Sequence, residues 1–128
     1  MLRRSLQVVL TILGVVAVSA GGITVLFGAD SVVGGGSVSA SVDSELRFYA
    51  TWYVLVGALL LRAVPRVEAE AFTIRAVFVT LFLAGVARVI SIIAVGTPHR
   101  FLLVLLGLEL GLPILLIPWQ ALVARRRD

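Results

Sequence analysis

The chain has 128 residues, of which 60% are hydrophobic and 14% charged, and its mean hydropathy is +1.12. Because a soluble domain has about a quarter charged residues, this composition predicts an integral membrane protein, with room for one compact bundle and no separate soluble domain. The absence of cysteine excludes disulfides, thiol catalysis and cysteine-ligated metals. The net charge of +4 comes from arginines scattered near segment ends, and this distribution fits membrane topology better than nucleic-acid binding.

Four segments are long enough to cross a bilayer, whose core of about 30 Å needs roughly 20 apolar residues per helix. They predict an all-α fold, a four-transmembrane-helix bundle that forms a single membrane domain over residues 1–128. By the positive-inside rule, the arginines place both termini in the cytoplasm. Arginine without lysine, together with abundant Ala, Val, Gly and Leu, suggests a GC-rich bacterial genome, and hence a multi-pass protein of the bacterial inner (plasma) membrane. The predicted spans are 6–27, 44–64, 72–95 and 101–123, and the arginines used for orientation are Arg3, Arg4, Arg62, Arg66, Arg75, Arg125, Arg126 and Arg127.

The first segment begins like a signal peptide, with two arginines and a small-residue sequence at Val18-Ser19-Ala20. The apolar run continues to Phe27, so we expect a retained helix. Ala17 and Gly21 lie four residues apart, a spacing that favours close helix packing. The connection that follows, residues 28–43, is rich in Gly and Ser and is typical of a flexible loop; a backbone cradle for a phosphate or headgroup is the alternative.

The second segment opens with charged and aromatic residues that we expect on the external side. Glu45, Tyr49 and Trp52 follow helical i, i+4, i+7 spacing and share one face, whereas Arg47 points away from Glu45. Tyr49, Trp52 and the neighbouring Tyr53 fit an interfacial aromatic belt, and the alternative is that they line a small ligand cavity.

Arg88 and Glu109 lie inside the third and fourth apolar segments, where an unpaired charge costs several kcal/mol. Counted from the short connection between these segments, they lie about 10 Å and about 12 Å deep at 1.5 Å per residue. This nearly equal depth predicts an ion pair between them. This pair is either an internal structural contact or, with Glu45 and Arg47, part of a polar cluster that binds a ligand.

The remaining motifs favour packing over chemistry. Gly107 and Gly111 form a GxxxG face on the fourth segment, in which two prolines, Pro113 and Pro118, should kink or loosen the helix. His99 is the only histidine and has no second ligand at metal-binding spacing, so we expect no metal and give it at most a supporting role in the polar cluster. We identify no catalytic residues and no cofactor, and without lysine no P-loop exists.

The stretch Ser44-Glu45-Leu46-Arg47-Phe48-Tyr49-Ala50, with Gly85-x-x-Arg88-x-x-Ser91, Gly96-x-Pro98 and Glu109-x-x-x-Pro113, resembles a family of small four-helix bacterial membrane proteins of unknown function. The resemblance covers nearly the whole chain. It implies a fold and a set of candidate positions, and it implies no activity.

Three functions remain open from the sequence. The first is a non-enzymatic accessory subunit of a larger inner-membrane assembly, in contact with membrane lipids and other integral subunits; an envelope lipid-import transporter of the mammalian-cell-entry type is one host, although no residue selects it. The second is a binder or carrier of a small amphipathic or lipid ligand through the polar cluster. The third, ranked last, is an enzyme that acts on a membrane lipid with Glu45 or Glu109 as general acid or base, because a neighbouring arginine opposes the raised pKa that such a role needs.

Overall fold

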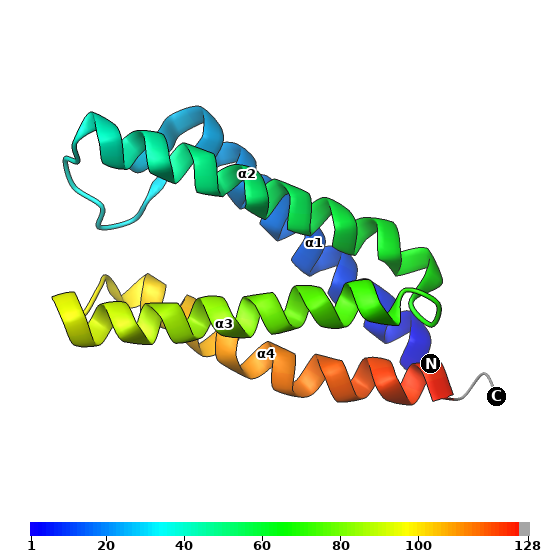
Figure 1. Cartoon of the computed structure of the whole chain (residues 1–128). Helices are drawn as coiled ribbons and strands as arrows, with labels where there is room; N and C mark the ends of the chain where they lie inside the picture. Colours follow the sequence, from blue (N-terminus) through cyan, green and yellow to red (C-terminus); the bar gives the residue numbers. More distant parts are fainter. Residues whose placement is uncertain (126–128) are drawn as a thin grey trace. The chain divides into compact units, whose positions relative to one another are not determined.

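Helices make up almost all of the computed structural model, which describes residues 1–125 (Figure 1). No strand occurs among these residues, and each of the four long helices is long and apolar enough to cross a membrane. The all-α prediction with four such helices is therefore confirmed; Arg126 and Arg127, which were used for orientation, lie outside the described residues. The elements are α1 (Leu2–Phe27), the 3-10 turn η1 (Gly28–Ser31), α2 (Ala40–Ala63), the 3-10 turn η2 (Val64–Arg66), α3 (Ala71–Val95) and α4 (Arg100–Arg125).

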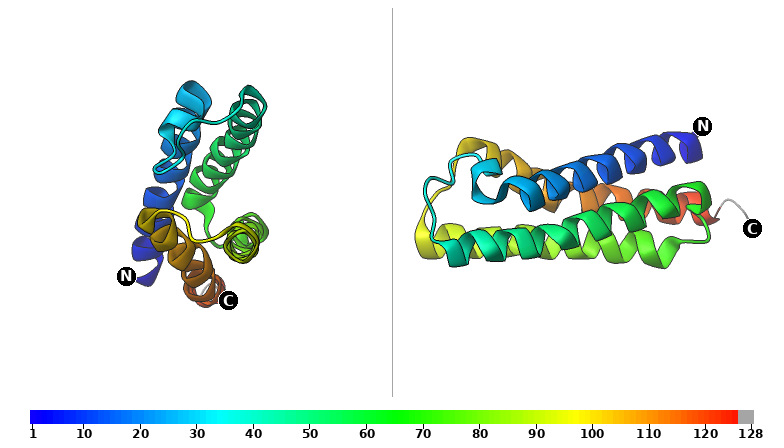
Figure 2. Two further views of the ribbon diagram at one scale, coloured as in Figure 1. Left: turned by 90° about the vertical axis from the view of Figure 1, so that its left-hand side faces the viewer. Right: turned by 90° about the horizontal axis from the view of Figure 1, so that it is seen from above.

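The helices form two hairpins, with α1 beside α2 and α3 beside α4 (Figures 1 and 2). They belong to two compact units: one comprises Gln7–Pro65, and the other joins Met1–Leu6 to the chain from Arg66 onward. Because the chain divides into these two units, the single four-helix domain stays a prediction.

Glycines allow α1 and α2 to approach closely. A methyl group added at Gly14 would lie 2.7 Å from Leu61, one at Gly57 would lie 2.8 Å from the Gly14 carbonyl oxygen, and one at Gly21 would lie 2.8 Å from the carbonyl oxygen of Ala50. Such distances are incompatible with a side chain, which is the usual reason for small residues at membrane-helix contacts. Gly21 thus has the packing position that its spacing predicts, and Ala17, on the same helix, is half-buried.

The α3–α4 contact uses a different glycine from the pair expected in the sequence. Gly85 lies against Leu110, where an added methyl group would come within 2.7 Å of a side-chain carbon. Gly107 and Gly111 have no such neighbour within 4 Å in the described structure, so their face does not contribute to the α3–α4 contact. A packing role for Gly107 and Gly111 therefore stays a prediction.

Local capping sets the helix ends. Ser39 accepts a hydrogen bond from the Val42 amide at 3.3 Å and starts α2 at Ala40, four residues before the predicted boundary. Gly96 ends α3 at a positive φ of 117°, a conformation that glycine adopts readily. The imidazole Nδ1 of His99 accepts from the Phe101 amide at 3.2 Å and so caps the start of α4. That helix continues without a break through Pro113 and Pro118.

Candidate functional site

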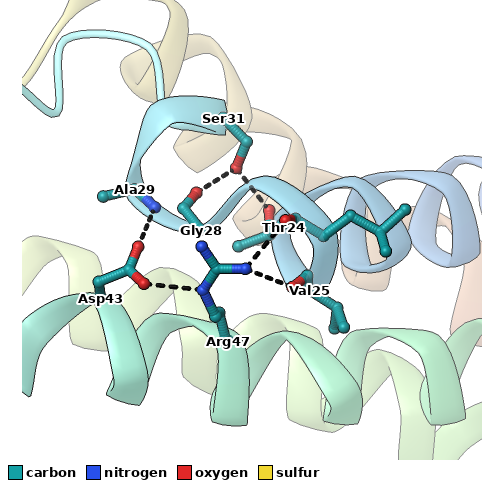
Figure 3. Close-up of polar contacts among 8 residues, drawn as sticks. Thr24, Val25, Gly28, Ala29, Ser31, Asp43 and Arg47 are labelled. Atoms are coloured by element: carbon teal, nitrogen blue, oxygen red, sulfur yellow. Dashed lines mark hydrogen bonds and ion pairs between the residues drawn. The ribbon is translucent and has the colours of Figure 1, made fainter. Parts of the chain in front are cut away.

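The main polar site of the first hairpin joins the start of α2 to the end of α1 (Figure 3). Arg47 Nε donates to Asp43 Oδ2 at 2.7 Å, and its Nη1 donates to the carbonyl oxygens of Val25 and Leu26, each at 2.9 Å. These carbonyls belong to the last turn of α1. Carbonyl groups in the last turn of a helix have no N–H partner within that helix. Arg47 therefore acts as a C-terminal cap for the preceding helix.

Asp43 completes this site from the other side. Its Oδ1 accepts from the Ala29 amide at 2.8 Å, at the head of η1. Gly28 has a φ of 57°, and a side chain there would collide with the Asp43 carboxylate. Ser31 Oγ donates a hydrogen bond to the Gly28 carbonyl oxygen at 2.7 Å and lies 3.0 Å from Thr24 Oγ1 (Figure 3). The connection predicted as a flexible loop therefore begins with a defined turn held by α2.

Asp43 is a residue that the sequence reasoning missed as a site residue. Its spacing of four from Arg47, with the acid first, is the favourable arrangement for a helical ion pair and was the available signal. Arg47 was assigned to the polar cluster with Glu45, and the structure pairs it with Asp43 instead.

The second hairpin contains the ion pair predicted from the equal depths of Arg88 and Glu109. Arg88 Nε donates to Glu109 Oε2 at 2.7 Å. The carboxylate is 8% exposed and the guanidinium side chain 34%, so the acid is the deeply buried partner. Gly85 lies one turn before Arg88 and brings α4 close enough for this contact. The pair is present, and whether it also binds a ligand stays a prediction.

A second polar contact between α3 and α4 was not predicted. Gln120 is fully buried; its Oε1 accepts from Arg75 Nε at 2.9 Å, and its Nε2 donates to the Val67 carbonyl oxygen at 3.0 Å. Gln120 ties α4 both to α3 and to the segment before α3. In the same unit, Arg3 Nε lies 2.6 Å from Glu68 Oε1. A polar amide inside an otherwise apolar stretch was the signal for Gln120.

The other predicted residues lie on exposed surface. Glu45 is exposed and forms no hydrogen bond or ion pair with any residue from 1 to 125. Tyr49 and Trp52 are exposed as well, and each packs edge-to-face against Phe48. Tyr53 differs, because its Cβ lies over Gly21 in the α1–α2 contact.

Glu45 and Arg47 belong to one compact unit, and Arg88 and Glu109 belong to the other. The four-residue polar cluster therefore stays a prediction. Within residues 1–125, no group of three or more His, Cys, Asp or Glu side chains is arranged to hold a metal ion.

The fold thus defines a class: all-α proteins with four helices long and apolar enough to cross a membrane, and with charged side chains paired inside each helical hairpin. A family model described as "Domain of unknown function (DUF4345)" matches residues 5–120, and the chain belongs to that family. Comparisons with curated proteins and with solved structures gave no match.

Proposed function

We propose that this protein is a non-enzymatic accessory subunit of a larger assembly in the bacterial inner membrane, with both termini in the cytoplasm. The orientation is supported by Arg3 and Arg4 in the first turn of α1 and by Arg66 between α2 and α3. Asp30, in the connection between α1 and α2, lies on the opposite side in this topology.

The observation that carries the proposal is that each hairpin contains an internal ion pair. Glu109 is paired with Arg88, and Arg47 is paired with Asp43 while it also caps α1. The outward surfaces of the helices carry large apolar side chains, among them Ile12 on α1, Leu83 on α3 and Leu115 on α4, which are all at least half exposed. A surface of this kind suits lipid and the transmembrane helices of other subunits.

Gly107 and Gly111 provide one place for such a partner helix. An added methyl group at either position meets nothing within 4 Å in the described structure, and the GxxxG spacing permits close helix approach. An envelope lipid-import transporter of the mammalian-cell-entry type is the host that we would test first.

Affinity purification at endogenous expression level, followed by mass spectrometry, tests this proposal. We expect other integral membrane subunits in stoichiometric amounts. The double variant Gly107→Ile/Gly111→Ile should lose them, whereas Gly22→Ile, at another glycine with open space around it, should retain them. Recovery of the native protein only as a monomer or homo-oligomer would contradict the proposal.

A second candidate, the binding of a lipid or another small amphipathic ligand, is favoured by a specific observation. Glu45 has no partner among residues 1–125 and lies beside exposed aromatic side chains on α2. Native mass spectrometry of the protein released from lipid vesicles tests this function, since a binder should retain phospholipid in a defined number of copies. Complete loss of lipid under gentle activation would exclude it.

A further inference from the structure

We infer that one side of α2, formed by Glu45, Phe48, Tyr49 and Trp52, binds the positively charged ammonium headgroup of a membrane phospholipid. The inference deepens the second candidate function and rests on it, because it names the class of lipid and the residues that would select it. It does not depend on the identity of any partner subunit.

The four residues share one side of the helix. At 100° per residue, Phe48, Tyr49 and Trp52 all lie within about 60° of Glu45 in projection. Glu45 and Trp52 are about 10 Å apart along the axis, at 1.5 Å per residue. The three aromatic side chains are 55–59% exposed, and Glu45 is exposed too. The surface is therefore accessible over a length comparable to that of a phospholipid headgroup.

Glu45 differs from three other carboxylates of the chain, and it shares the lack of a partner in residues 1–125 with Asp30. Asp43, Glu68 and Glu109 each form an ion pair with an arginine of the same unit. Glu45 forms none with the residues that the structure describes. The helix dipole favours a negative charge in the first turn of a helix, and Glu45 lies beyond the first turn of α2. A negative side chain near the end of an apolar helix, without a counter-ion among residues 1–125, is suited to a cation from the surroundings.

The neighbouring aromatic rings also attract cations. Phe48 meets Tyr49 at a centroid distance of 5.4 Å and an interplanar angle of 70°, and Trp52 at 6.5 Å and 77°. In an edge-to-face arrangement the rings present their electron-rich faces in different directions. Ammonium groups are attracted to such faces, and most strongly to tryptophan.

The position on an apolar helix indicates a lipid as the source of the cation. Below Trp52, the same side of α2 continues with the apolar residues Val56 and Leu59, against which an acyl chain can lie. A soluble ammonium ion would gain nothing from that apolar continuation. The surface therefore combines a counter-charge for the headgroup with apolar area for the chain.

The test uses the full-length protein in vesicles of equal amounts of phosphatidylethanolamine and phosphatidylglycerol with identical acyl chains. The two lipids differ only in their headgroups, of which the first carries an ammonium group and the second does not. After release from the vesicles, native mass spectrometry counts the lipids that each protein molecule retains. We expect phosphatidylethanolamine to be retained in preference to phosphatidylglycerol.

Glu45→Gln and Trp52→Leu should each reduce this preference about two- to fivefold, the effect of losing one exposed charge or cation–π contact. Asp30→Asn removes another exposed carboxylate with no partner in residues 1–125, and Phe72→Leu removes an exposed aromatic ring from α3. Both controls should retain the native preference. Circular dichroism should show unchanged helix content in all four variants, since each change is at an exposed side chain.

Three outcomes would overturn the inference. A preference for phosphatidylglycerol would show that the arginines select the lipid. A preference for phosphatidylethanolamine that is unchanged in both Glu45→Gln and Trp52→Leu would show that other residues cause the preference. The candidate lipid-binding function would not be contradicted by that result. Retention of no lipid at all would remove the candidate binding function together with the inference.

Discussion

Arg88 and Glu109 are 21 positions apart in the sequence and form an ion pair of 2.7 Å that joins α3 to α4. The two partners are unequal, because the carboxylate is almost completely buried and the guanidinium side chain is one-third exposed. Removing the arginine should therefore harm the protein more than removing the acid, since it leaves the buried charge without a partner.

We expect Arg88→Leu to reduce the free energy of unfolding by about 2–3 kcal/mol and Glu109→Leu by about 1–2 kcal/mol, with values discounted for the exposure of Arg88. The double variant should lie within about 1 kcal/mol of the native protein, because an apolar pair avoids the desolvation cost. The free energies of unfolding of the three variants can be measured in mixed micelles, as the fraction of a denaturing detergent is increased. Additive losses in the double variant would mean that the two residues do not act as a pair.

The contact of Arg47 with the end of α1 leads to a prediction about local stability. Arg47→Leu removes the donors to Val25 and Leu26 and the partner of Asp43, so it should cost about 1–2 kcal/mol. Hydrogen exchange should become faster at the Ala29 amide, whose acceptor Asp43 loses its positioning partner.

Glu45→Gln is the matched control for Arg47→Leu. It changes a charge two residues away that forms no hydrogen bond or ion pair with residues 1–125, and it should leave the exchange rate at Ala29 unchanged. Equal acceleration in both variants would show that general charge near the start of α2, and no specific cap, controls this turn.

Two adjacent glycines of α1 provide a test of the α1–α2 contact. Gly21→Leu places a side chain against the Ala50 carbonyl oxygen and Tyr53 and should reduce stability by about 1–3 kcal/mol through overpacking. Gly22→Leu points into open space and should be neutral or slightly stabilising, since leucine favours helix more than glycine does. Thermal unfolding monitored by circular dichroism compares them, and similar losses would argue against the contact.

The stability of the protein should depend on the hydrogen bonds of Gln120, even when a substitution preserves the volume of its side chain. Gln120→Leu leaves the Val67 carbonyl and Arg75 without their buried partner and should cost about 1–3 kcal/mol. Gln120→Glu keeps an acceptor for Arg75 and loses the donor to Val67, so at neutral pH it should restore only part of the stability. If Gln120→Leu were as stable as the native protein in the same thermal unfolding assay, these hydrogen bonds would have no net value.

The ion pair of Arg88 and Glu109 could be predicted from the amino-acid sequence, because opposite charges inside adjacent apolar segments fall at nearly equal distances from a short connection. The partner of Arg47 was harder to assign. Asp43 and Glu45 both lie within four residues of it, and only the position of the α1 end shows that Asp43 can bind Arg47 and the Ala29 amide together.

The amino-acid sequence by itself determined the four helices and placed six of their eight ends within two residues, whereas α1 and α2 each begin four residues before the predicted boundary. In long apolar segments the backbone groups can be satisfied only within each helix, so composition and length suffice. The tertiary structure alone decided which glycines form the helix contacts and how Gln120 reaches Val67. Segments that are apolar on every side carry no marked inward face, and so their rotation and register depend on packing against a neighbour.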